Sequence, residues 1–186
     1  LRSQVRTLDP LAAVSLDNSL TDGLMADSVN ARLLVSPLPP LPFASALQGA
    51  LNYPYGCAEQ TTSKGYAALI LDQATSSMLG ADGLDAKTRR ERMEGAFGRL
   101  ASMQVANGNF SMWGDDGYVN PWLTPYITEF LLDAKDAGFA VPDNVLQKAL
   151  NRLSEDLLSG GNQFYGQEDR EKLKFANQAY SGYVLA

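Results

Sequence analysis

Four prolines within six residues divide this chain more sharply than any other feature of the sequence. They lie in the segment 37–42, where the only other residues are two leucines. Proline fixes φ and lacks a backbone N–H, so neither a helix nor a central strand can continue through this segment. We therefore predict a boundary here, with residues 1–36 belonging to a preceding domain and residues 37–186 to a second one.

The segment before the boundary has the character of strand and loop. Ala12–Leu16 and Val29–Val35 are short runs compatible with β structure. Turn-type clusters, Asp17–Ser19 and Thr21–Gly23, separate them. We predict a short β or irregular segment for residues 1–36.

Beyond the boundary, apolar residues recur at the spacing of one helix face. The predicted stripes are Ala67, Ile70, Leu71, Ala74 and Met78; Met93, Phe97 and Leu100; Leu123, Tyr126, Ile127, Phe130, Leu131 and Ala134; Leu146, Ala149, Leu150, Leu153 and Leu157; and Phe175, Ala179, Tyr180, Tyr183 and Val184. Start signals stand at Asn120–Pro121 and Pro142, and stop signals at Gly80, Gly138 and Gly160. The pattern predicts a mainly α fold of antiparallel amphipathic helices, of the kind found in part of an α/α toroid.

One loop bears on the toroid. The segment Gln104–Trp113 resembles the Gln-Gly-aromatic turns that join helix pairs in α/α-toroid proteins. It is equally compatible with an ordinary glycine turn whose aromatic side chains fold back onto the core. The sequence leaves both interpretations open.

Composition excludes several classes of function. The chain has a net charge of −6, without a basic cluster, so nucleic acid is not an expected partner. It contains one cysteine and no histidine, which removes an internal disulfide, a Cys-based zinc site and Ser-His or Cys-His catalysis. We expect no cofactor and no metal. The missing initiator Met and the apolar helical run at the end suggest a fragment of a longer protein.

The most informative segment is Tyr53–Ser63, which reads Tyr-Pro-Tyr-Gly-Cys-Ala-Glu-Gln-Thr-Thr-Ser. It resembles the thioester region of the alpha-2-macroglobulin and complement superfamily, whose core is Cys-x-Glu-Gln, and in particular the bacterial branch. Pro37–Gln48 is similar to the start of that family's thioester domain. Pro121–Tyr126 resembles the family's Trp-Leu-Thr-Ala-Tyr helix start, with Pro125 in place of Ala.

The resemblance implies a protease inhibitor that traps its target covalently. The partners that it implies are target proteases, captured through lysine, and other domains of the parent chain. It also implies a periplasmic parent, anchored to the inner membrane by a lipid.

The spacing within the motif supports this chemistry independently. Residues i and i+3 lie on the same side of a helical turn, so the Cys57 thiol can reach the Gln60 carboxamide. Attack by sulfur with loss of ammonia would leave an acyl thioester between them. Cys57 could otherwise be a small buried core residue, but its spacing from Gln60 and the matching flanks favour the thioester.

Three neighbouring residues have more open roles. Tyr53 and Tyr55 could shield the thioester from water, or could simply pack at the start of a helix. Glu59 could shuttle a proton, or could complement the helix dipole in the first turn.

The absence of histidine predicts how the thioester would react. Without an imidazole to accept the acyl group, direct attack by an amine is the expected route. Each molecule would then react once, so the chain would be a trap and not an enzyme. Two alternatives remain: a helical toroid without a thioester that serves as a docking module, and an α/α-barrel hydrolase. The hydrolase would have to draw its carboxylates from Asp115, Asp116, Glu129 and Asp133.

Overall fold

The structure, a computed structural model, describes residues 21–25, 29, 43–52, 56–79, 83–114, 119–160 and 170–186. The chain divides into two compact units, Leu1–Pro42 and Phe43–Ala186, which are described separately. The division falls at the end of the proline segment.

In the first unit, the described residues form a turn. The Leu24 amide donates to the Thr21 carbonyl (3.0 Å), and Gly23 has a φ of 78°. This is the turn that the polar cluster predicts. The β-compatible runs predicted for this unit lie outside the described residues, apart from Val29.

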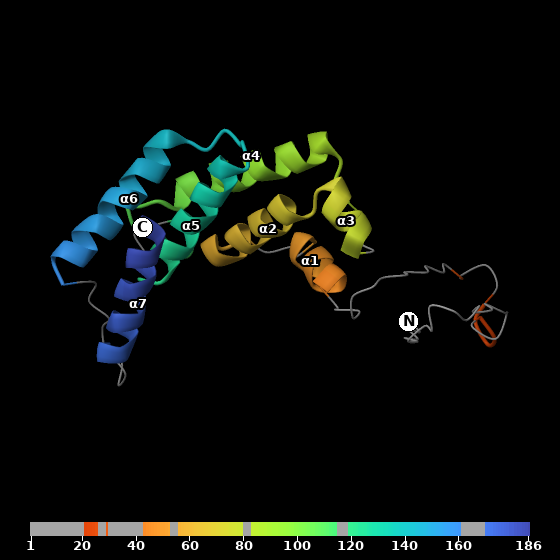
Figure 1. Cartoon of the computed structure of the whole chain (residues 1–186), viewed down its shortest axis with the longest axis horizontal. Coiled ribbons are helices and arrows are strands. Elements are labelled where there is room, and N and C mark those ends of the chain that lie inside the picture. Colours follow the sequence, from red (N-terminus) through yellow and green to blue (C-terminus); the bar gives the residue numbers. More distant parts are fainter. Residues whose placement is uncertain are drawn as a thin grey trace, which may run out of the picture. The chain divides into compact units, whose positions relative to one another are not determined.

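The second unit is built from helices, as Figure 1 shows. In the described residues these are α1 (Phe43–Leu51), α2 (Ala58–Ile70), α3 (Gln73–Leu79), α4 (Ala86–Met103), α5 (Leu123–Asp136), α6 (Asp143–Leu158) and α7 (Arg170–Leu185). Helix α2 contacts α1, α4 and α5, and α5 in turn contacts α6 and α7. The mainly α fold predicted from the sequence is confirmed.

The helix ends follow local signals. Asp85 caps α4, because its side chain accepts hydrogen bonds from the backbone amides of Lys87 (3.0 Å) and Thr88 (2.9 Å). Helices α5 and α6 are followed by Gly138 and Gly160, which have φ of 85° and 80° and end these helices as predicted.

Helix α5 begins later than the start signal predicts. We expected Asn120 as the cap with Pro121 as the first helical residue, but α5 begins at Leu123. A turn precedes it, in which the Leu123 amide donates to the Asn120 carbonyl (3.0 Å).

The prediction of one continuous helix from Ala67 to Met78 is wrong. Helix α2 ends at Ile70 and α3 begins at Gln73. The break has a local cause, because Asp72 Oδ1 accepts a hydrogen bond from the Thr75 amide at 2.7 Å and so caps α3. That bond also holds the pKa of Asp72 below its usual value.

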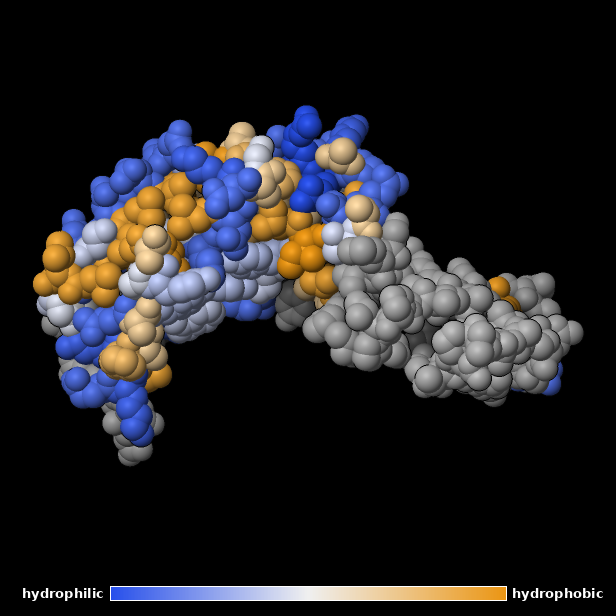
Figure 2. All heavy atoms as spheres, in the orientation of Figure 1, coloured by the Kyte–Doolittle hydropathy of each residue, from blue (hydrophilic) through white to orange (hydrophobic). Residues whose placement is uncertain are grey.

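Three of the predicted stripes form the core. The buried apolar residues include Met93, Phe97 and Leu100 of α4, Leu123, Ile127, Phe130, Leu131 and Ala134 of α5, and Leu146 and Ala149 of α6. Figure 2 shows further apolar surface, in orange, over the region of α5 and α6, and strongly hydrophilic surface, in dark blue, over the start of α4.

The stripe predicted for α7 is only partly correct. Val184 is buried as predicted, but Phe175 and Tyr183 are 73% and 68% exposed, and the polar residues Asn177 and Ser181 are buried. Helix α7 contacts α6 and α5. A hydrogen bond from the Tyr180 hydroxyl to Glu129 joins α7 to α5. The apolar spacing alone therefore misassigned part of the buried face.

Candidate functional site

Cys57 lies at the cap position of α2, where the chain is still extended (φ −66°, ψ 169°). Only 4% of the residue is exposed. The loop that follows α4 closes over this end of the helix, since the Ala58 amide donates to the Met112 carbonyl (2.9 Å). The sulfur is therefore placed at a helix start that other parts of the unit cover.

Gln60 returns to the same point from the first turn of α2. Its side-chain oxygen Oε1 accepts a hydrogen bond from the Cys57 amide at 3.3 Å. The two residues have the arrangement of a capping box, with cysteine in place of Ser or Thr and glutamine at the third helical position. The structure thus brings the Gln60 side chain to the Cys57 amide across one turn.

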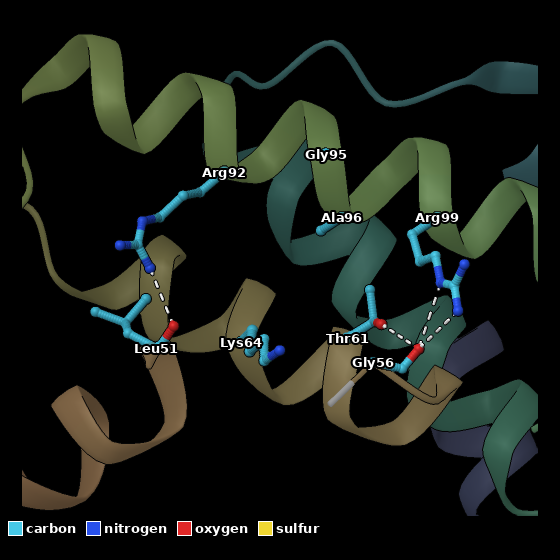
Figure 3. A pocket seen from close by; sticks show the side chains of 8 residues that line it. All are labelled: Leu51, Gly56, Thr61, Lys64, Arg92, Gly95, Ala96 and Arg99. Carbon is cyan, nitrogen blue, oxygen red and sulfur yellow. Dashed lines mark hydrogen bonds between the residues drawn. The ribbon is translucent and has the colours of Figure 1, made fainter. Parts of the chain in front are cut away.

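The carbonyl of Gly56, immediately before Cys57, is held from α4 and α2. Arg99 donates to this oxygen from Nε and from Nη2, each at 3.4 Å, and the Thr61 hydroxyl donates at 3.4 Å (Figure 3). These residues border a cavity of about 290 Å³, whose described lining consists of Leu51, Gly56, Thr61, Lys64, Arg92, Gly95, Ala96 and Arg99. Sequence reasoning missed Arg99, because nothing local links it to residue 56.

Glu59 faces a hydroxyl pair that joins α2 to α5. Ser63 Oγ donates to Glu59 Oε1 (3.2 Å) and lies 3.1 Å from the Tyr126 hydroxyl. Burial raises the pKa of Tyr126, and the charge of Glu59 adds to this, so the phenol stays protonated at neutral pH. Glu59 also lies in the first turn of α2, where a carboxylate complements the helix dipole.

The loop Gln104–Trp113 shows features of both interpretations. Gln104 Nε2 donates to the Val145 carbonyl of α6 (2.9 Å), so the glutamine ties two helices together. Gly108 has a φ of 90°, and a Cβ there would lie 2.5 Å from the Lys148 carbonyl oxygen. Phe110 is fully buried in the core, whereas Trp113 is largely exposed.

Other residues considered from the sequence are placed as follows. Tyr53, Tyr55, Asp115 and Asp116 lie outside the described residues. Glu129 accepts a hydrogen bond from Tyr180, and Asp133, which is exposed, accepts one from Tyr66 (3.1 Å).

The described part of the chain shows neither a metal site nor a membrane span. It contains no group of three His, Cys, Asp or Glu residues that could bind a metal ion. None of its helices combines the length and the apolar character that crossing a bilayer requires.

Comparison with known proteins identifies the family. The family model "A-macroglobulin TED domain" matches residues 28–172. An alpha-2-macroglobulin of Xylella fastidiosa (strain Temecula1) is 66% identical over 186 residues, which cover 100% of this chain and 11% of that protein. The chain therefore spans about a tenth of the length of this relative.

Solved structures of alpha-2-macroglobulins also match this chain. A crystal structure of Salmonella alpha-2-macroglobulin reacted with methylamine matches with a TM-score of 0.74 and 35% identity, covering 81% of this chain and 10% of that one. Trypsin-activated alpha-2-macroglobulin from Escherichia coli matches with a TM-score of 0.66 and 34% identity, covering 72% of this chain and 9% of that one.

These likenesses confirm the helical toroid predicted for the second unit. They cover the capped cysteine, its glutamine and the helices that surround them. The chain belongs to the family of A-macroglobulin TED domains.

Proposed function

We propose that this chain carries an internal thioester, between Cys57 Sγ and Gln60 Cδ, through which the parent protein captures attacking proteases. One observation carries the proposal: Gln60 Oε1 is held at 3.3 Å from the Cys57 amide, at the buried cap of α2. A thiol and a carboxamide fixed across one turn need little further ordering to react.

Formation of the thioester releases one molecule of ammonia. Cys57 Sγ attacks Gln60 Cδ, the S–C bond forms, and the bond from Cδ to Nε2 breaks. The thiol proton leaves with the nitrogen as ammonia. In capture, a target amine attacks Cδ, the new N–C bond forms and the S–C bond breaks. The proton that the amine loses ends on Cys57 Sγ, which is released as a thiol.

Burial of Cys57 favours storage of the thioester, because water must be kept away from an acyl carbon that hydrolyses. In this proposal Tyr53 and Tyr55 supply further shielding. Glu59 shuttles a proton, with Ser63 and Tyr126 holding its carboxylate in place.

An amine is the favoured nucleophile because the chain contains no histidine that could form an acyl intermediate. The reaction of the Salmonella relative with methylamine supports this preference. The trypsin-activated Escherichia coli relative supports proteases as the trigger. Since the thioester is consumed and Gln60 stays bonded to its target, each molecule reacts once, as a trap and not as an enzyme. We further propose a periplasmic, lipid-anchored parent, as the bacterial resemblance implies.

The test uses the complete protein and two measurements. Intact mass should be one ammonia below the value calculated from the sequence. Treatment with methylamine should then add one molecule at Gln60 and release one thiol at Cys57, located by mass spectrometry of the peptide 53–64. Glycerol should compete poorly.

The Cys57→Ser variant is the matched control, because serine retains the helix cap but cannot form the thioester. It should show neither the mass deficit nor methylamine incorporation. A wild-type protein with its full sequence mass would instead support the alternative, a helical docking module without a thioester. Glycerol esters that form as readily as methylamide would contradict the amine preference.

A further inference from the structure

We propose that Arg99 is a positioning residue for the reaction between Cys57 and Gln60, acting through the peptide group that joins Gly56 to Cys57. The proposal rests on the proposed thioester. It adds a residue of α4, far from the motif in sequence, to the residues that support formation of the thioester and its attack by an amine.

The peptide group between Gly56 and Cys57 is held at both ends. Its carbonyl oxygen accepts two hydrogen bonds from the Arg99 guanidinium, each at 3.4 Å. Its N–H, which belongs to Cys57, donates to Gln60 Oε1 at 3.3 Å. Because the peptide group is planar and its C–N bond has partial double-bond character, the two ends are electronically connected.

The polarisation of this peptide group by Arg99 favours the reaction. A cation at the carbonyl draws electron density toward the oxygen, and hydrogen bonds along such a chain polarise one another. The Cys57 N–H therefore becomes a stronger donor. It faces Gln60 Oε1, the oxygen on which negative charge develops when sulfur attacks the carboxamide and again when an amine attacks the thioester. Backbone N–H groups in such positions stabilise the oxyanion.

Arginine suits this position better than lysine. Its guanidinium offers several N–H donors in a fixed plane, and here two of them, Nε and Nη2, reach the same oxygen. The Thr61 hydroxyl shares that oxygen at 3.4 Å and limits its movement from the helix side. Lysine would keep the charge but lose this planar fork.

Arg92 provides a matched comparison in the same helix. It also borders the cavity, is exposed like Arg99, and donates through Nη1 to a backbone carbonyl, that of Leu51, at 3.1 Å (Figure 3). Leu51 lies at the end of α1 and has no hydrogen bond to the reacting pair among those described. Replacing Arg92 therefore removes an equivalent charge and an equivalent anchor without touching the peptide group before Cys57.

The experiment compares the complete wild-type protein with Arg99→Met, Arg99→Lys and Arg92→Met. Three quantities are measured: the fraction with the ammonia deficit, the rate constant for methylamine incorporation, and the infrared stretching frequency of the Gln60 carbonyl, labelled with carbon-13. Loss of a single oxyanion donor slows catalysis by about 10² to 10³, so weakening one through Arg99 should slow incorporation by roughly tenfold.

Arg99→Met should show that slower rate and a higher carbonyl frequency, because its oxyanion donor is weaker. Arg99→Lys should recover part of both effects, and Arg92→Met should match wild type. Amide hydrogen exchange of α2 and α4 shows whether each variant is folded. If Arg99→Met misfolds, Arg99→Lys alone tests the proposal, and its rate constant for methylamine incorporation should be measurably lower than that of wild type.

Wild-type rate and frequency in a folded Arg99→Met protein would overturn the inference. So would an equal effect of Arg92→Met, which would reflect general charge in the cavity. A wild-type protein without the ammonia deficit would instead remove the proposed function itself, so the two failures can be told apart.

Discussion

Gly65 of α2 lies against the ring of Phe130, so its replacement should disturb the packing of α2 on α5. A Cβ built at this position would lie 2.3, 2.7 and 3.0 Å from three ring atoms of Phe130. Phe130 belongs to α5 and is fully buried. Its ring is enclosed by Tyr66 and Phe97, whose ring centroids lie 5.1 and 5.9 Å away. Gly65→Ala therefore forces a rigid ring out of a filled space.

The expected magnitude combines two opposing effects. Carbon atoms in contact lie about 3.5 Å apart, so the ring of Phe130 must retreat by roughly 1 Å. Overpacking of this kind costs about 1–3 kcal/mol, and full enclosure of the ring favours the upper end of that range. Alanine in place of a helical glycine stabilises the helix by about 1 kcal/mol. We expect a net loss of about 2 kcal/mol in the free energy of unfolding.

Urea unfolding of the chain, followed by far-ultraviolet circular dichroism, measures this loss. Gly95→Ala in α4 is the matched control, because its Cβ would meet nothing within 4 Å. It should stabilise the chain by about 1 kcal/mol, the opposite sign. Phe130→Leu should reduce the cost of Gly65→Ala, since a smaller side chain can yield. If Gly65→Ala stabilised the chain as much as Gly95→Ala does, the close approach of α2 and α5 would be refuted.

Three further predictions follow from the site and its supports. Gln60→Ala should abolish covalent capture of a protease by the complete protein, assayed as an adduct on denaturing gels, with a stability change of about 1 kcal/mol or less. Thr124→Val should lower the free energy of unfolding in urea by about 1–3 kcal/mol, because buried Asn109 Oδ1 and the Phe110 amide both lose their Thr124 partner. Thr128→Val should cost less, because it removes only one hydrogen bond to a helical carbonyl. Hydrogen bonds from the Thr88 side chain and amide lower the pKa of Asp85. The stability that these bonds give is present above the ordinary aspartate pKa of 3.8 and is lost as pH falls through the lower folded pKa; acid titration of Asp85→Ala should not show this loss.

Much of the site could be predicted from the sequence because it is local. Cys57 and Gln60 are three positions apart, and any helical turn over that spacing brings their side chains together. The same applies to the helix starts and stops, although the cap at Asp72 divided what the apolar spacing had joined. Periodicity cannot detect such a break when the apolar residues on both sides keep the same phase.

The sequence by itself determined the helical character of the second unit and the contact of Gln60 with the Cys57 amide, because hydrogen bonds within one turn depend only on neighbouring residues. Tertiary structure alone decided which groups surround that pair. Arg99 is 43 residues from Gly56, and Tyr126 is 63 residues from Ser63. It also decided that α7 buries Asn177 and Ser181 and leaves Phe175 exposed. Contacts of this range depend on how the helices pack against one another, and no pattern along a single helix encodes the partner that it will meet.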